Sequence, residues 1–292
     1  MAKCTGRRGT STGIIASWLP RDDPVAGSIV PPVYVSAVFE HPGEKLLEPE
    51  VGDLKYSREN NPTVMLLEEA MACAEGSDWS LAFNSGMAAI ASIIMALARP
   101  GLRLVAPRLL YGATRSLLID LSLRLGFSLE LAGPPWDEFL HEADKADLVL
   151  VETVGNPTLR VPPLRDVYKT CQDRGCKVIV DNTFASPVAY KPVPDGAFLA
   201  VESTTKYIAG HNDTVGGIVA GVDGRVREWL WRWRKNLGTI MQPLEAYLTL
   251  RGAKTLEARF KALSSNAMKV AEWLSTHPKV SRVYYPGLES HP

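Results

Sequence analysis

The chain has 292 residues, with 32 Lys and Arg against 32 Asp and Glu, and 46% of its residues are hydrophobic. This composition is typical of a globular protein rather than a disordered or collagen-like one. The balanced charge provides no basic field for nucleic acid, and the longest apolar stretch, residues 86–98, is too short to span a bilayer. We therefore expect neither nucleic acid nor a membrane as a partner.

Residues 1–55 are predicted to form an N-terminal arm rather than a domain. Prolines recur from Pro20 to Pro49, and no helical or strand period persists long enough to build a core. Such an arm lies over another part of the protein, either its own domain or a neighbouring subunit. No apolar run follows Arg7 and Arg8, so a secretory signal is not expected.

Residues 56–245 alternate helical patterns with short apolar runs, which predicts βαβ units and a mostly parallel sheet. Near-continuous apolar runs are typical of strands covered on both faces. The expected strands are 102–106, 147–152, 177–182, 198–202 and 216–220, and the expected helices are 62–74, 86–98, 111–125 and 163–174. We predict an α/β fold in which this segment forms the large domain.

Residues 246–292 are predicted to begin a second, smaller α/β domain that is incomplete in this chain. A helical period runs beyond Pro243, with apolar side chains from Leu256 to Leu274 on one face. A strand is expected to start at Lys279. One helix and one strand are too little to bury a domain core.

Four cysteines in 292 residues are too few and too scattered for a disulfide framework. This count favours a reducing compartment, and we expect a cytoplasmic protein. Cys171 and Cys176 have no second Cys or His pair at zinc spacing, so no metal site is predicted.

The candidate functional residues follow the apolar runs, because ligands of open parallel sheets bind outside the carboxyl ends of the strands. They are Glu152, Asn156, Asp181, Asn182, Ser203, Thr204, Thr205 and Lys206, together with Ser85, Gly86 and Met87 at the start of a helix. A lysine for an aldehyde, an acid for a ring nitrogen and donors for a phosphate are what pyridoxal 5'-phosphate (PLP) requires. No GxGxxG or Walker A sequence occurs to favour a nucleotide instead.

Each residue also has an ordinary structural explanation. Asp181 is placed where a helix N-cap or an Asx turn is common, and an isolated Lys206 would be a surface lysine. The hydroxyls from Ser203 to Thr205 could cap a helix, Tyr111 could be a core aromatic, and Tyr56 with Arg58 could form a surface cation–π pair. The functional interpretation depends on their joint occurrence and order.

Eight segments together resemble one enzyme family. In chain order they are YSRENNPT (56–63), NSGMAAI (84–90), YGAT (111–114), GNPT (155–158), VDNTFASP (180–187), STTKYIAGH (203–211), RGAKTLEAR (251–259) and YPGLESHP (285–292). They are similar to the signatures of the Cys/Met metabolism (transsulfuration) family of PLP-dependent enzymes, which includes cystathionine synthases and lyases. The resemblance implies the fold type I architecture of aspartate aminotransferase.

The same resemblance implies the roles of individual residues. Lys206 forms the internal aldimine with PLP, Asp181 pairs with the pyridinium nitrogen, and Tyr111 stacks on the ring. Asn156 lies near the cofactor's 3-hydroxyl. The phosphate is bound by the amides of Gly86 and Met87 and the hydroxyls of Ser203 and Thr205. Glu152 and Glu202 are given no definite role, and His211 is expected to fix the loop after the lysine.

Tyr56 and Arg58 match residues that complete the phosphate site of a neighbouring subunit in this family. The resemblance therefore implies a homo-oligomer with shared active sites, in which two dimers form a tetramer. Lys206, Tyr111 and Tyr56 are the candidate catalytic residues.

The implied substrates are small sulfur amino acids or activated homoserine, which undergo γ-replacement or γ-elimination. Ala113 stands where methionine γ-lyases carry cysteine, which argues against that specialisation. The alternative is a catalytically idle truncated homologue that acts as a binding or scaffold protein.

Overall fold

A seven-stranded sheet lies at the centre of the computed structural model, which describes residues 27–40 and 50–291 together with Thr10 and Ile14. The strands lie in the order β1-β7-β6-β5-β4-β2-β3. They are β1 (Trp79–Phe83), β2 (Arg103–Pro107), β3 (Ser128–Ala132), β4 (Leu148–Glu152), β5 (Lys177–Asp181), β6 (Leu199–Glu202) and β7 (Gly217–Gly221). Pairing is parallel from β6 through to β3, and β7 is antiparallel to both of its neighbours. The predicted mostly parallel α/β sheet is confirmed.

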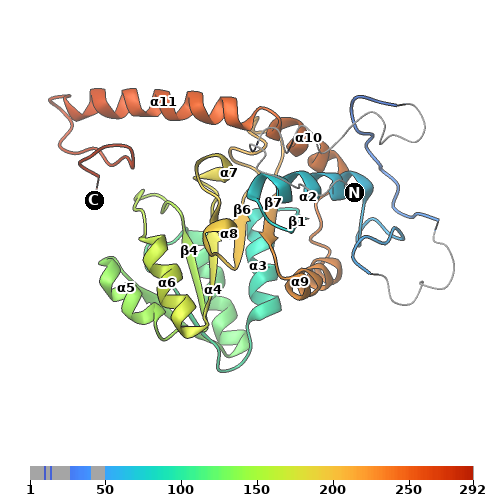
Figure 1. Ribbon diagram of the computed structural model, residues 1–292, viewed down its shortest axis with the longest axis horizontal. Coiled ribbons are helices and arrows are strands. Elements are labelled where there is room, and N and C mark those ends of the chain that lie inside the picture. The colour runs from blue at the N-terminus through green and yellow to red at the C-terminus, as the bar shows by residue number, and fades with distance from the viewer. Residues whose placement is uncertain (1–9, 11–13, 15–26, 41–49, 292) are drawn as a thin grey trace.

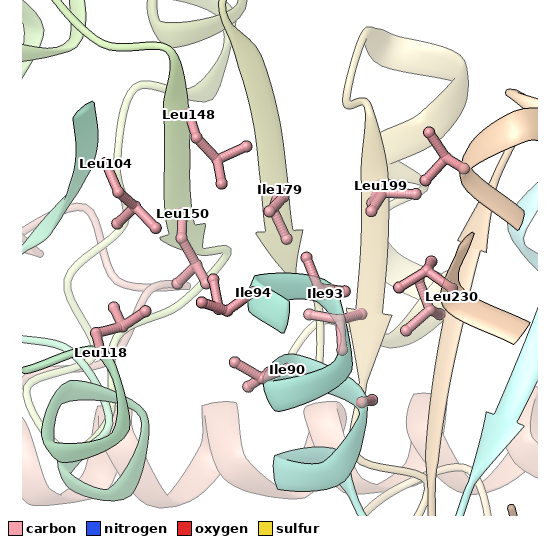
Figure 2. Close-up of a cluster of buried hydrophobic side chains, with 14 of the residues drawn as sticks. Ile90, Ile93, Ile94, Leu104, Leu118, Leu148, Leu150, Ile179, Leu199 and Leu230 are labelled. Carbon is pink, nitrogen blue, oxygen red and sulfur yellow. The ribbon is translucent and has the colours of Figure 1, made fainter. Parts of the chain in front are cut away.

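Helices cover both faces of this sheet (Figure 1). They are α2 (Pro62–Glu75), α3 (Gly86–Leu97), α4 (Gly112–Leu125), α5 (Trp136–Ala143), α6 (Leu164–Arg174), α7 (Ser186–Ala189), α8 (Pro192–Asp195), α9 (Gly224–Leu237), α10 (Pro243–Ala253) and α11 (Leu256–Ser275). On one face, side chains of α3, α4 and α9 form a core with alternate strand residues. Figure 2 shows Ile90, Ile93 and Ile94 of α3 in the middle of this cluster, with Leu118 on one side of them and Leu230 on the other. The other face is covered by α5 and α6 at one end and by α2 and α10 at the other.

Capping residues explain where the two helices nearest the site begin. Asn61 accepts a hydrogen bond from Thr63 N before the proline that starts α2, and Ser85 accepts one from Ala88 N at the start of α3. Gly76 ends α2 at a φ of +68°, a left-handed conformation that glycine adopts without steric cost. Residues 75 and 86 are therefore fixed at the ends of rigid elements.

The C-terminal segment differs from the prediction in two respects. The helical stretch is divided into α10 and α11 at Lys254 and Thr255, where Arg259 donates to the carbonyl of Gly252. The strand expected at Lys279 is wrong, because residues 279–291 form turns and irregular backbone. No neighbouring strand is present among the described residues to pair with that segment.

Residues 27–40 of the predicted arm lie along the start of α2. Tyr34 N donates to Thr63 Oγ1 over 2.9 Å, and Val38 forms an isolated antiparallel bridge with Tyr56. Most of the remaining arm lies outside the described residues, so the division into arm, large domain and C-terminal segment stays a prediction.

A disulfide links Cys171, in the last turn of α6, to Cys176, directly before β5. This local bond spans a sequence separation of five residues, and Cys73 is disulfide-bonded as well. The bond is nevertheless at odds with the reducing environment that the cysteine count favoured. Among the described helices, none is long and apolar enough to cross a membrane.

Candidate active site

A cavity of about 250 Å³ lies at the carboxyl ends of β4, β5 and β6, beside the start of α3. This is the position expected for a ligand of an open parallel sheet. Eight of the residues predicted to hold the cofactor line it: Gly86, Met87, Tyr111, Asn156, Asp181, Ser203, Thr205 and Lys206. Residues more than 100 positions apart in the chain therefore converge on one space.

The N-terminus of α3 forms one wall of the cavity and is suited to a phosphate. The first hydrogen bonds at this end are Ala88 N to Ser85 Oγ and Ala89 N to Ser85 O, so the amides of Gly86 and Met87 are left to donate to a ligand. A Cβ at Gly86 would lie 2.9 Å from the Cβ of Ser203. Glycine is needed there because the helix end and the segment after β6 approach so closely.

Asp181 ends β5 and points its carboxyl group at the cavity. It accepts hydrogen bonds from Thr183 Oγ1 over 2.6 Å and from Thr183 N over 3.1 Å. Burial raises the pKa of Asp181 above its ordinary value, and these bonds only partly offset that effect. A protonated ring nitrogen beside Asp181 would supply the opposite charge that favours the carboxylate. The site therefore fits the pyridine ring of PLP.

Thr183 is a site residue that the sequence analysis missed. Its hydroxyl also accepts a hydrogen bond from Ser203 N over 2.9 Å, which joins the end of β5 to the segment after β6. The Asp-Asn-Thr sequence after an apolar strand is the available signal, because an aspartate commonly bonds the backbone two residues later.

Lys206 projects into the cavity from a turn that follows β6. Its backbone is fixed by the bonds Lys206 N to Ser203 O (3.2 Å) and Gly210 N to Lys206 O (2.9 Å). The Thr205 hydroxyl accepts a bond from Gly216 N, directly before β7. His211 Nδ1 lies 2.6 Å from the carbonyl of Ala209, and the expected role of His211 in fixing this loop stays a prediction.

Glu152 lies at the end of β4 and contacts two neighbouring segments of the cavity wall. Its Oε1 accepts a hydrogen bond from Tyr111 N over 2.9 Å, and its Oε2 accepts one from Asn156 N over 3.3 Å. Burial raises the pKa of Glu152 to about 7. The sequence analysis left the role of Glu152 open, and the structure places it between Tyr111 and Asn156.

Tyr56 and Arg58 are not among the residues that line this cavity. Arg58 lies over the Tyr56 ring at 5.2 Å and donates to the carbonyl of Lys235 over 2.7 Å, near the end of α9. Within one chain they are the surface cation–π pair that the sequence analysis considered. Their predicted place in a neighbouring subunit's site stays a prediction.

Comparison with known proteins gives one consistent result. The family described as Cys/Met metabolism PLP-dependent enzyme matches residues 12–292. Cystathionine γ-synthase of Mycobacterium tuberculosis H37Rv is 38% identical over 285 residues, which cover 93% of this chain and 70% of that protein. Cystathionine β-lyase of Coxiella burnetii is 34% identical over 276 residues, which cover 93% of this chain and 70% of that protein.

A solved structure agrees with these relatives. Cystathionine γ-synthase of Xanthomonas oryzae pv. oryzae, in complex with aminoacrylate and cysteine, superimposes with a TM-score of 0.89 at 37% identity. The match covers 98% of this chain and 73% of that chain. With this likeness, the family match and a cavity suited to the phosphate and ring of PLP, the chain belongs to the Cys/Met metabolism family of PLP-dependent enzymes.

Proposed function

We propose that this chain catalyses transsulfuration chemistry, either γ-replacement or γ-elimination on a small amino-acid substrate. The observation that carries the proposal is the convergence of Lys206, Asp181 and the N-terminus of α3 on one cavity. The named relatives, which are cystathionine synthases and lyases, support the same class of reaction. The substrates we propose are sulfur amino acids or activated homoserine.

PLP, when bound, provides an electron sink for the charge that develops beside the substrate's amino group. Lys206 would hold the cofactor through its primary amine and, when the substrate's amino group has taken that place and the lysine amine is free, would carry protons between substrate carbons. Asp181 supplies the negative charge that keeps the ring nitrogen protonated. Both roles require the side chains to share one cavity, as they do here.

The other residues of the cavity are proposed to bind the cofactor and to orient its ring. The amides of Gly86 and Met87 and the hydroxyls of Ser203 and Thr205 donate to the phosphate. Tyr111 would cover one face of the ring, and Asn156 would contact the side of the ring that carries the hydroxyl group. Glu152 holds Tyr111 and Asn156 through their backbone amides. Ala113 in place of cysteine favours a synthase or lyase of cystathionine over a methionine γ-lyase.

We further propose a homo-oligomer, at least a two-fold dimer and more fully a dimer of dimers, in the cytoplasm. In a single chain, Tyr56 and Arg58 lie outside the cavity that they are expected to complete. A planar guanidinium suits a phosphate, so Arg58 would serve the neighbouring copy. Closed symmetric assemblies are the usual form of such oligomers.

The test is cofactor attachment. The protein incubated with PLP should develop a visible absorption band. Reduction with borohydride should then attach the cofactor permanently, as a label, to a peptide that contains Lys206. Lys206→Ala should abolish both, whereas Lys169→Ala, at an exposed position of α6, should change neither. A colourless wild type, or a label retained in Lys206→Ala, would reject the enzyme and favour the alternative of an idle binding protein.

A further inference from the structure

Two glutamate side chains face each other on the sheet face away from the cofactor cavity. Glu75 is the last residue of α2 and has no exposed surface, and Glu202 is the last residue of β6 and is 1% exposed. Val201, the preceding residue of β6, lines the cavity. Because successive strand side chains point to opposite faces, Glu202 points away from the cavity. Each carboxyl group shifts the pKa of the other, so the two lie close together, and three of their four oxygens have no hydrogen-bond partner among the described residues.

Few donors or cations are available to stabilise negative charge on these two carboxyl groups. Glu202 Oε1 accepts a bond from Asn182 Nδ2 over 2.8 Å. Within the described part of the chain, no amide, hydroxyl or cationic donor reaches either oxygen of Glu75 or the second oxygen of Glu202. The charged groups that act on the pair are Lys191, directly before α8, and Asp181, in β5. Lys191 carries the charge opposite to that of an ionised Glu75, and Asp181 carries the same charge as the pair.

Two buried carboxylates in contact cannot both ionise without a cation between them. A carboxyl–carboxyl hydrogen bond itself needs a proton on one partner, since an ionised carboxylate is only an acceptor. Burial raises the pKa of both groups, and for Glu202 the neighbouring Glu75 and Asp181 raise it further. The pair therefore retains at least one proton at pH values where an exposed glutamate has none.

Asn182 connects this pair to the cofactor site. Its Nδ2 donates to Glu202 and to the carbonyl of Tyr190, and its Oδ1 accepts a bond from Thr153 Oγ1 over 2.8 Å. Thr153 N in turn donates to the carbonyl of Asp181 over 2.9 Å. One network thus joins the carboxyl ends of β4, β5 and β6, and it includes the backbone of Asp181.

We propose that Glu75 and Glu202 share a proton and that this protonated pair is a positioning device, which holds Asn182 and thereby the strand ends that present Asp181 and Ser203 to the cofactor. Loss of the shared proton leaves two facing carboxylates, whose repulsion loosens the network beneath the site. The role at the cofactor rests on the proposed function, whereas the shared proton itself does not.

The first experiment tests the shared proton in the cofactor-free protein. Glu75→Gln puts a permanent amide donor where the proton lies, so this variant keeps the hydrogen bond at every pH. A group with a raised folded-state pKa stabilises below its ordinary pKa and loses that contribution as pH rises through the folded value. As pH rises above the ordinary glutamate pKa, the Tm of the wild type should fall relative to that of Glu75→Gln by about 2 °C per pH unit for as long as the folded pair keeps its proton, and the difference should stop growing once that proton is lost.

Glu138→Gln, which neutralises an exposed carboxylate, is the matched control and should follow the wild type. Parallel melting curves for wild type and Glu75→Gln across the range would overturn the proposal. If Glu75→Gln does not fold, Glu202→Gln replaces the other carboxyl group of the pair with an amide and can be compared with the wild type in the same way. Infrared spectra of the unmodified protein give an independent measurement, because a protonated carboxyl shows a carbonyl band that a carboxylate lacks, and absence of this band at neutral pH would also overturn it.

The second experiment tests positioning in the PLP-bound protein. Above the pH at which the Tm difference stops growing, PLP affinity measured by absorbance titration should weaken in the wild type relative to Glu75→Gln, by up to about tenfold per pH unit. Equal affinities above that pH would overturn the positioning role and leave only a structural pair. If no variant binds PLP at any pH, the proposed function fails, and the melting and infrared results still decide the shared proton.

Discussion

The carboxyl group of Glu152 accepts a hydrogen bond from the backbone amide of Tyr111 over 2.9 Å, so the position of the residue proposed to stack on the cofactor depends on a side chain of β4. Tyr111 is the N-cap residue of α4, and its side chain forms no capping hydrogen bond with the first amides of that helix. The bond from Glu152 fixes where this helix begins.

Replacing Glu152 with Gln should change how stability depends on pH. Burial raises the pKa of Glu152 to about 7, so its contribution to folding is fully present below its ordinary pKa and is lost as pH rises through about 7. The wild type should therefore lose up to about 3 kcal/mol relative to Glu152→Gln between about pH 5 and about pH 8. Urea unfolding of the cofactor-free protein at several pH values measures this difference. A difference independent of pH would contradict the raised pKa.

Gly86→Ala should weaken cofactor binding by disturbing the phosphate wall. The added Cβ would lie 2.9 Å from Ser203 Cβ and 3.2 Å from Ser203 Cα, so the backbone after β6 must move. Gly224→Ala is the control, because it also changes the first residue of a helix but meets no atom within 4 Å. We expect Gly86→Ala to lower PLP affinity at least about tenfold, a loss of about 1.4 kcal/mol, with Gly224→Ala unchanged. Equal affinities in the two variants would be inconsistent with the close approach.

Arg234→Met should be strongly destabilising. Arg234 of α9 is 1% exposed, forms an ion pair with Glu68 of α2, and donates to the carbonyl of Ala82 over 2.9 Å. Removing it leaves a buried carboxylate without its cation, which costs about 3–5 kcal/mol. Arg232→Met on the same helix breaks an exposed pair with Glu228 and should cost less than about 1 kcal/mol. Chemical denaturation of the two variants side by side provides the comparison, and similar losses in both would contradict the buried pair.

Mixing two inactive variants should restore activity if sites are shared between subunits. Lys206→Ala and Arg58→Ala should each give a homo-oligomer without a competent site. A mixed dimer should regain one site, with Lys206 from one copy and Arg58 from the other, and activity should recover to about a quarter of the wild type for random pairing of equal amounts. Co-refolding of the two chains followed by an activity assay measures this. Activity no greater than the mean of the two parents would place Arg58 in its own subunit.

The cavity residues were predictable because polar side chains of the required types directly follow apolar strands in the sequence. Asp181, Lys206 and Glu152 each follow an apolar strand, and parallel strands bring such positions to one edge. The Glu75–Glu202 contact was not predictable from such a pattern, because it joins the end of a helix to the end of a strand 127 residues later through packing across the sheet.

The elements missed in the sequence have identifiable reasons. The edge strand β3 is partly exposed and carries Glu130, so its apolar run is interrupted. The helix α9 carries arginines among its tryptophans, although Asp223 at its start and Gly238 at its end were available as capping signals. The strand expected at Lys279 had the apolar pattern but no partner among the described strands, and pattern alone does not supply one.

The antiparallel insertion of β7 between β1 and β6 has a consequence for how the chain folds during synthesis. Trp79 of β1 pairs with Gly221 of β7, and these residues lie at opposite ends of the large domain's sequence. During synthesis, β1 leaves the ribosome long before β7, the strand with which it pairs. Until β7 is made, the backbone groups on both edges of β1 are unpaired. Closing such a distant contact is slow, so the edge of β1 is the surface on which a nascent chain would aggregate.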